Sequence, residues 1–243
     1  MTGGAAYRRG VAALAWAGLA FLLFPVFFTA VVAFGGSMFI EFPPRSLSLR
    51  WFENIGAINR IGAAALNSFG IALVAGLLAT AIGAAAALAL ARYPVPGRAA
   101  ITAVLLSPIA LPIVAIGLAL IQFFVLLGIE FTWWSLLIGH LVITVAYPVR
   151  TVAASLALSN PSLEEAGASL GAPPLAVFRT VTLPQMMPGL VSGFLFAFLI
   201  SFDNYPVSIF LVRGDLFSLP AGPVAAAGGV HWRSFERETS SDP

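Results

Sequence analysis

The sequence predicts an all-α, polytopic membrane protein with about five transmembrane helices. Of its 243 residues, 60% are hydrophobic and only 9% are charged, whereas about 25% of the residues in an ordinary soluble domain are charged. The mean hydropathy is +0.98, and long uncharged runs recur along the chain. Because these runs are continuous and do not alternate with polar residues, they favour helices over the strands of a membrane barrel.

Five uncharged runs are long enough to cross the membrane, since a helix needs roughly 20 apolar residues to span about 30 Å of hydrocarbon. They cover residues 11–34, 61–91, 99–129, 131–149 and 180–202. The predicted organisation is a cytoplasmic N-terminus (1–10), a first transmembrane helix (11–35), a periplasmic loop (36–60), a transmembrane core (61–215) that contains a cytoplasmic helical hairpin within 159–186, and an atypical C-terminal tail (216–243).

The first run could instead be a signal peptide, because "YRRG" at its start resembles a charged leader. A signal peptide has an apolar core of about 7 to 15 residues and a small-residue cleavage site. The run 11–34 is longer and no such site closes it, so we expect a membrane helix.

Arginine placement predicts that the N-terminus is cytoplasmic. Arg8 and Arg9 precede the first run, the loop 92–98 carries two further arginines, and the loop 128–133 carries none. Cytoplasmic loops are enriched in basic residues. Residues 36–60 also contain arginines, which weakens this argument, because the same orientation makes that long loop external. With this orientation the loop between the fourth and fifth runs faces the cytoplasm.

The composition excludes several classes of function. The twelve basic residues, all of them arginine, are nearly balanced by ten acidic ones and form no basic stripe, so no nucleic-acid partner is expected. There is no cysteine for a disulfide or a thiolate metal site, and His140 and His231 are far apart in the sequence. We predict no metal site and no cofactor.

The loop between the fourth and fifth runs reads as two short helices. Ser162 is predicted to cap the first, with Glu165 three residues later completing a capping box. Gly171 suits the left-handed position that ends a helix, and Pro174 suits the first turn of a second helix. That second helix is expected to run to about Leu183 and to stop at Pro184.

A sequence pattern runs through the same loop. It consists of Glu-Ala-Gly, then Gly after three residues, then Val after nine residues, and Leu-Pro one residue later; the positions are Glu165, Ala166, Gly167, Gly171, Val181, Leu183 and Pro184. The pattern resembles the Glu-Ala-Ala (EAA) motif of permease subunits in binding-protein-dependent ABC importers, the MetI-like type I family. Gly167 replaces the second Ala and Val181 replaces Ile.

Further stretches resemble the spermidine/putrescine branch of that family. They are "FPPRSLSLRWFENI" (42–55), "LNSFGIAL" (66–73), "ARYPVPGR" (91–98), "SPIALPIVAIGLAL" (107–120) and "SFDNYPVS" (201–208). The resemblance implies an inner-membrane permease without a catalytic site of its own, whose hairpin is a coupling helix docked on a cytoplasmic ATP-binding cassette dimer. It also implies a second permease subunit, an external substrate-binding protein, contact with membrane lipid and alternating access. The alternative is a secondary transporter or channel subunit that is not coupled to an ATPase.

An enzyme reading rests on residues 167–171, which match the G-x-S-x-G nucleophile elbow of serine hydrolases. The elbow needs a turn from a strand into a helix. Ser169 falls in the body of a predicted helix, and neither His140 nor His231 is placed to act as its base. We therefore expect no hydrolase site.

Polar residues within apolar runs are candidates for a translocation path, because burying them in a membrane is costly. We select Asn67, Asp203 and Asn204 on this ground, with packing as the alternative for Asp203. For His140 we expect a hydrogen-bonded packing role.

Prolines and glycines in the runs predict bends and close contacts. Pro108, Pro112 and Pro148 should bend their helices. Gly189 and Gly193 form a G-x-x-x-G that allows close approach of another helix.

The tail differs from the family pattern, in which a sixth span follows. After Pro220 the sequence contains no apolar run of spanning length, so we expect the sixth span to be missing and residues 221–243 to be irregular. Five crossings from a cytoplasmic N-terminus would place residues 213–243 outside.

Overall fold

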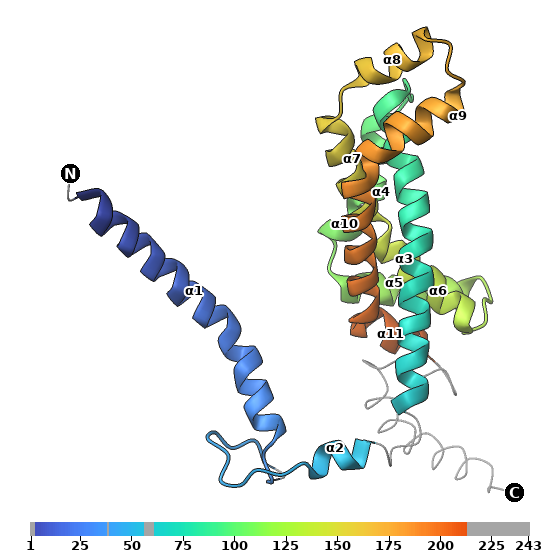
Figure 1. The fold of residues 1–243 in the computed structure, drawn as a ribbon. Helices are drawn as coiled ribbons and strands as arrows, with labels where there is room; N and C mark the ends of the chain where they lie inside the picture. Colours follow the sequence, from blue (N-terminus) through green and yellow to red (C-terminus); the bar gives the residue numbers. More distant parts are fainter. Residues whose placement is uncertain (1–2, 38, 56–60, 213–243) are drawn as a thin grey trace, which may run out of the picture. The chain divides into compact units, whose positions relative to one another are not determined.

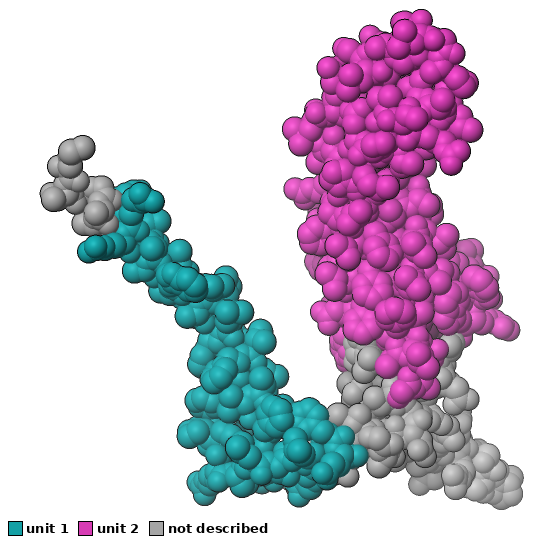
Figure 2. Space-filling model, in the orientation of Figure 1, with its two compact units in different colours: residues 1–59 teal, residues 60–243 magenta. Residues whose placement is uncertain are grey.

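The computed structural model describes residues 3–37, 39–55 and 61–212. It divides into two compact units, residues 1–59 and 60–243, coloured separately in Figure 2. The described residues are helical, apart from loops and one isolated bridge between Gly35 and Leu47. The all-α prediction is confirmed. The predicted tail, with the expected loss of a sixth span, lies outside the described residues.

The helices follow one another along the chain as shown in Figure 1. Their bounds are α1 Gly3–Ala33, α2 Arg50–Ile55, α3 Ile61–Arg92, α4 Arg98–Ala110, α5 Ile113–Leu126, α6 Trp133–Thr144, α7 Ala146–Leu158, α8 Pro161–Ser169, α9 Pro174–Val177, the π-helix η1 Phe178–Thr182, α10 Leu183–Phe202 and α11 Tyr205–Leu211.

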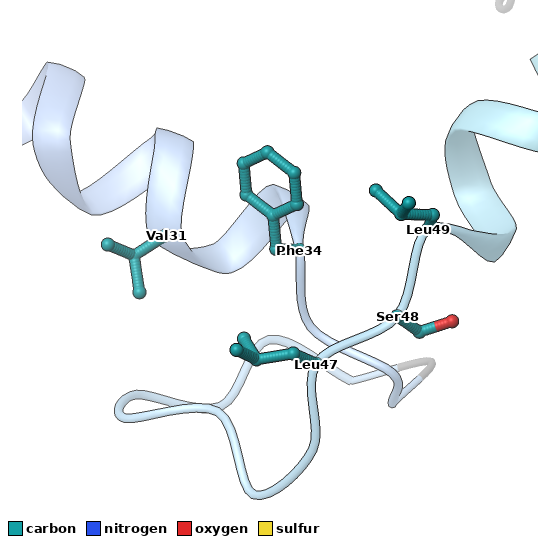
Figure 3. A pocket seen from close by; sticks show the side chains of 5 residues that line it. All are labelled: Val31, Phe34, Leu47, Ser48 and Leu49. Carbon is teal, nitrogen blue, oxygen red and sulfur yellow. The ribbon is translucent and has the colours of Figure 1, made fainter.

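Unit 1 consists of the long apolar helix α1, a returning loop and α2. The loop is tied to the end of α1 by backbone hydrogen bonds, from Gly36 N–H to the Ser46 carbonyl (2.9 Å) and from Ser48 N–H to the Phe34 carbonyl (2.8 Å). An open pocket of about 440 Å³ lies at this junction, and Figure 3 shows the side chains that line it. They are Val31, Phe34, Leu47, Ser48 and Leu49.

Four helical segments in the described residues are long and apolar enough to cross a membrane. They are Tyr7–Ala33, Gly62–Arg92, Trp133–Leu158 and Pro174–Phe202. The pair α4 and α5 passes the same test together but is bent by 109°, which brings the total to five if the pair is one broken span. The described residues therefore contain four clear membrane segments, and the predicted five are reached only if this bent pair, which was predicted as the single run 99–129, counts as one span.

The break between α4 and α5 lies at Pro112. The residue before a proline is pushed towards an extended conformation, and Leu111 has φ −95° and ψ 146°. Pro108, also predicted to bend the chain, lies inside α4 without breaking it. Its missing N–H leaves the Val104 carbonyl without a helical donor, and the Ser107 hydroxyl donates to that carbonyl at 2.8 Å.

A milder interruption separates α6 from α7 at Val145. Pro148 cannot donate a hydrogen bond to the carbonyl of Thr144, the last residue of α6. The run Trp133–Leu158 still passes as one membrane segment, so the predicted effect of Pro148 appears as a local interruption.

Helices α3, α7 and α10 pack closely along small residues. Ala72, Ala75 and Ala79 of α3 are completely buried. A Cβ placed on Gly83 would lie 2.9 Å from the Val149 backbone nitrogen of α7. Apolar burial drives helix association weakly in lipid, so small residues that allow close backbone contact are the expected interface.

The G-x-x-x-G pair on α10 makes the predicted close helix contact, and the helix that it contacts is α7. A Cβ on Gly189 would lie 2.6 Å from the Thr151 carbonyl oxygen, and one on Gly193 would lie 2.9 Å from Pro148 Cα. The Thr151 hydroxyl donates to the Gly189 carbonyl at 2.8 Å. Thus the contact combines close packing with an interhelical hydrogen bond.

We predict that Gly189→Ala destabilises the protein, because its new methyl group would meet backbone atoms of α7 that have no room to move. Overpacking of this kind costs about 1–3 kcal/mol. Gly70→Ala on α3 is the matched control, since nothing lies within 4 Å of a Cβ there. The measurement is the temperature of half-aggregation of the detergent-extracted protein. Equal temperatures for both variants would contradict this packing.

Candidate functional site

Helices α8 and α9 form a hairpin between α7 and α10, at one end of unit 2 (Figure 1). The opposite end of α10 leads to α11. The predicted site residues lie at these two places, the hairpin end and the α10–α11 corner.

The first helix of the hairpin begins two residues earlier than predicted. Asn160 is its N-cap, and its side-chain oxygen accepts a hydrogen bond from Ser162 N–H at 3.1 Å. Pro161 occupies the first helical turn, where its missing N–H costs nothing. The predicted capping box of Ser162 and Glu165 is therefore wrong: Ser162 lies inside the first turn.

The turn between the two helices is the predicted one. Gly171 has φ +84°, a left-handed conformation that glycine adopts without strain. Ala172 N–H donates to the Gly167 carbonyl (3.2 Å) and Gly171 N–H donates to the Ala168 carbonyl (2.9 Å). These two bonds form a Schellman motif, which satisfies the last carbonyls of α8.

The predicted stop at Pro184 is wrong. The segment Pro174–Phe202 continues as one helical run through α9, η1 and α10. Pro184 cannot donate to the Thr180 carbonyl and its ring would crowd that turn. The π-turn η1, Phe178–Thr182, widens the helix just before the proline, which accommodates it without a break. The hairpin is thus continuous with the last described membrane segment.

The two adjacent carboxylates of α8 have different surroundings. Glu164 is half-buried and pairs with Arg92 at the end of α3, with 3.0 Å between Arg92 Nη2 and Glu164 Oε1. Glu165 is exposed, and its carboxylate has no partner among the residues that the structure describes. The sequence prediction selected Glu165 and missed the pair of Glu164 with Arg92.

The residues of the EAA-like pattern lie on two sides of the hairpin. Glu165, Ala166, Gly171 and Pro184 are exposed. The inner side holds Gly167, Val181 and Leu183, which are all half-buried. A Cβ on Gly167 would lie 3.2 Å from the Val177 side chain, so a small residue at this position lets α8 approach the segment after it. The pattern therefore combines an exposed surface with the contacts that shape it.

Basic residues collect near the hairpin. Arg92 ends α3, Arg98 begins α4 and Arg179 lies in η1. Arg150 lies in the first half of α7, away from the end of α7 that leads into the hairpin. The loop 127–132, between α5 and α6, contains Glu130 and no basic residue. Cytoplasmic ends of membrane proteins are enriched in basic residues.

Asp203 lies at a break between two helices. α10 ends at Phe202, and Asp203 is its exposed C-cap residue. Asn204 is buried, and its side-chain oxygen accepts a hydrogen bond from Val207 N–H at 2.8 Å. Asn204 therefore starts α11, while the carboxylate of Asp203 has no partner in the described part of the chain.

His140 supports this break from both sides, in agreement with its predicted packing role. It is 3% exposed. Its Nδ1 lies 2.7 Å from the Ser201 hydroxyl of α10, and its Nε2 lies 3.3 Å from the Ser208 hydroxyl of α11. The ring joins the helices before and after Asp203.

Asn67 belongs to the same end of the unit. Phe69 of α3 contacts Phe198 of α10, with 5.7 Å between the ring centroids. Since α3 leads towards the hairpin and α10 leads away from it, the half-buried Asn67 lies near the end of α10 that carries Asp203. The structure brings the three predicted path residues to one region.

The other candidate sites gain no support from their geometry. Ser169 is the last residue of α8, and its hydroxyl donates to the Glu165 carbonyl at 2.9 Å; no strand-to-helix elbow surrounds it. No group of three metal-ligating side chains occurs among the described residues. The pocket of Figure 3 is lined by four apolar side chains and one serine, which gives it no charge to bind an ion.

The comparison with protein families gives one match. The family described as "Binding-protein-dependent transport system inner membrane component" matches residues 79–224. This range contains both the hairpin and the break at Asp203.

Individual relatives carry related names. The spermidine/putrescine transport system permease protein PotC of Haemophilus influenzae is 32% identical over 167 residues, which are 69% of this chain and 65% of the relative. The putrescine transport system permease protein PotI of Escherichia coli is 29% identical over 210 residues, 84% of this chain and 74% of the relative. The sulfate transport system permease protein CysT of Salmonella typhimurium is 32% identical over 152 residues, 58% of this chain and 55% of the relative. The matched part of this chain thus spans a little under two thirds of the Haemophilus protein.

Proposed function

Because the chain belongs to the family of binding-protein-dependent transport system inner membrane components, we propose that it is a permease subunit of an ABC importer. Its apolar helices make it a multi-pass membrane protein. The observation that carries the proposal is the hairpin, which is capped at both ends of α8 and continuous with a membrane segment. It exposes the Glu165 carboxylate, which has no partner in the described part of the chain.

The hairpin suits a docking element for a cytoplasmic ATPase. Both ends of α8 are capped, by Asn160 and by the turn at Gly171, so the helix keeps its shape without burial. None of its residues is buried. A partner that covers this surface would meet Glu165 and Ala166 first, and would act on a helix that continues through η1 into the membrane.

The arginines around the hairpin support a cytoplasmic position for it. By the positive-inside rule, the ends of α3 and α10 that meet the hairpin face the cytoplasm, and the α10–α11 corner lies towards the other side. Arg8 and Arg9 at the start of α1 support a cytoplasmic N-terminus by the same rule.

The proposed substrate is a polyamine. The relatives PotC and PotI are named for spermidine and putrescine. The exposed carboxylate of Asp203, which has no partner among the described residues, suits a polyammonium ion. CysT is named for sulfate, an anion that such a carboxylate would repel. The protein itself performs no covalent chemistry in this proposal, since ATP is hydrolysed by the partner subunit.

Transport proceeds by alternating access. The ATPase pair closes on ATP and moves the hairpins of two permease subunits. Because α9, η1 and α10 form one helical run, this movement reaches the α10–α11 break directly. There His140 holds both helices, so the position of Asp203 follows α10 and α11 together.

For the docking role, we predict that Glu165→Ala lowers ATP-dependent uptake and ATPase co-purification at least about tenfold, as expected when a charge pair at an interface is lost. The amount of permease in the membrane should not change, because the Glu165 carboxylate has no partner in the described chain. Glu130→Ala is the matched control, an exposed carboxylate between α5 and α6. Normal ATPase association in the Glu165 variant would contradict docking at this surface and would favour a transporter that works without an ATPase.

For the path role, we predict that Asp203→Asn reduces uptake of radiolabelled spermidine at least about tenfold while the complex still assembles. The Asn side chain keeps the shape of Asp and loses only its negative charge. A path that carries a cation through the membrane would require that charge. Glu130→Gln makes the same chemical change elsewhere and should have no effect. Loss of assembly in Asp203→Asn, with no separate transport defect, would instead assign Asp203 to packing.

A further inference from the structure

A charged clamp fixes α8 to the core of unit 2. It consists of Arg92, Ser159 and Glu164, which come from the end of α3, the end of α7 and the first half of α8. Arg92 Nε donates to both Glu164 oxygens, at 3.1 and 3.2 Å, and Nη2 donates to Glu164 Oε1 at 3.0 Å and to the Ser159 hydroxyl at 2.7 Å. The Ser159 hydroxyl in turn donates to the Leu156 carbonyl at 2.7 Å.

The clamp is sheltered from water. The side chains of Arg92 and Glu164 are 17% and 22% exposed, so their attraction is stronger than that of a pair on the surface. Loss of one partner would leave the other charge partly buried and unpaired, which costs more than the pair contributes.

Few other contacts hold α8. None of its residues is buried, and the close approach of Gly167 to Val177 joins it to the second helix of the hairpin rather than to the core. The clamp is therefore the polar link from α8 to α3 that the described contacts provide.

α3 is suited to carry a movement across the membrane. Its 32 residues correspond to a length of about 48 Å at 1.5 Å per residue. Ala87 is buried against α7 and α10 near the hairpin, and Ile71 is buried in the apolar cluster that contains Val207 and Leu211 of α11. A shift of α3 at its Arg92 end would therefore displace residues that pack at the α10–α11 corner.

We propose that Arg92 is a positioning residue for transport, which transmits movement of α8 to α3 through Glu164 and Ser159. This inference rests on the proposed function, because it assumes that a partner moves α8. It assigns two routes from the hairpin into the membrane: the covalent route through η1 and α10, and the ionic route through the clamp and α3. Both routes are needed for α3 and α10 to move together when α8 moves.

The test uses the complete transporter in proteoliposomes, and the readout is the number of ATP molecules hydrolysed for each spermidine imported. Arg92→Gln and Glu164→Gln should raise this ratio by roughly fivefold or more, the lower end of typical coupling between sites, while the ATPase remains bound. The double variant Arg92→Glu with Glu164→Arg should restore it in large part. Arg98→Gln, a neighbouring exposed arginine, is the matched control and should leave the ratio unchanged.

Milder variants keep the test decisive if the charge deletions reduce the amount of protein. Ser159→Ala removes one hydrogen bond, and Arg92→Lys keeps the charge but loses the two-pronged contact; both should raise the ratio by a smaller factor. An unchanged ratio in these variants, or no recovery in the charge swap, would overturn the role of the clamp.

The outcomes separate this inference from the proposed function. If the wild-type chain binds no ATPase, the proposed function fails. If it binds and hydrolyses ATP but imports no spermidine, the substrate proposal fails, and the clamp is then judged from spin labels at Leu77→Cys and Leu170→Cys. The ATP-driven change in distance between these labels should differ between wild type and Arg92→Gln and should return in the charge swap; identical changes would overturn the inference.

Discussion

Helix ends leave backbone N–H and carbonyl groups without partners inside the helix, and hydrocarbon offers none. At several of the described helix ends a specific residue supplies the missing partner or closes the turn. Asn160 caps α8, Gly171 closes it, and Asn204 caps α11. The two regions that we connect with function, the hairpin and the break at Asp203, are both interruptions of this kind.

Close packing makes these interruptions rigid. The small residues of α3 and the pair Gly189 and Gly193 bring α3, α7 and α10 into backbone contact. Helices in such close contact cannot shift independently, so a displacement at one end of the bundle reaches the other end. At one end of the bundle, the two ring nitrogens of the buried His140 contact α10 and α11. At the other end, the Arg92 guanidinium holds α8 to α3.

The sequence predicted the features that depend on neighbouring residues. Uninterrupted apolar runs gave the membrane segments, and Gly171 gave the turn of the hairpin. The cap of α8 lies two residues before the predicted Ser162, because Pro161 occupies the first helical turn and leaves the cap position to Asn160. Pro184 was read as a stop because a π-turn, which absorbs its missing hydrogen bond, has no clear sequence signal.

Contacts between distant residues could not be predicted in the same way. Glu164 and Glu165 are adjacent and chemically identical, and only the position of α3, 72 residues away in sequence, decides that Glu164 is the paired one. Likewise His140 could be assigned to packing, but its two serine partners on α10 and α11 emerge only when the helices are assembled. In the sequence, Arg92 at the end of the run 61–91 indicates membrane orientation, but it does not show which carboxylate it pairs with.

The central claim, a cytoplasmic hairpin that docks an ATPase, is tested most directly by thiol labelling. The chain contains no cysteine, so Leu170→Cys places a single thiol on the hairpin, at a position that is 88% exposed. A membrane-impermeant maleimide should label it in inside-out vesicles and not in intact cells with a permeable outer membrane, and bound ATPase should reduce the labelling. Glu130→Cys should show the opposite sidedness. Labelling of Leu170→Cys from outside, or labelling that the ATPase leaves unchanged, would contradict the account.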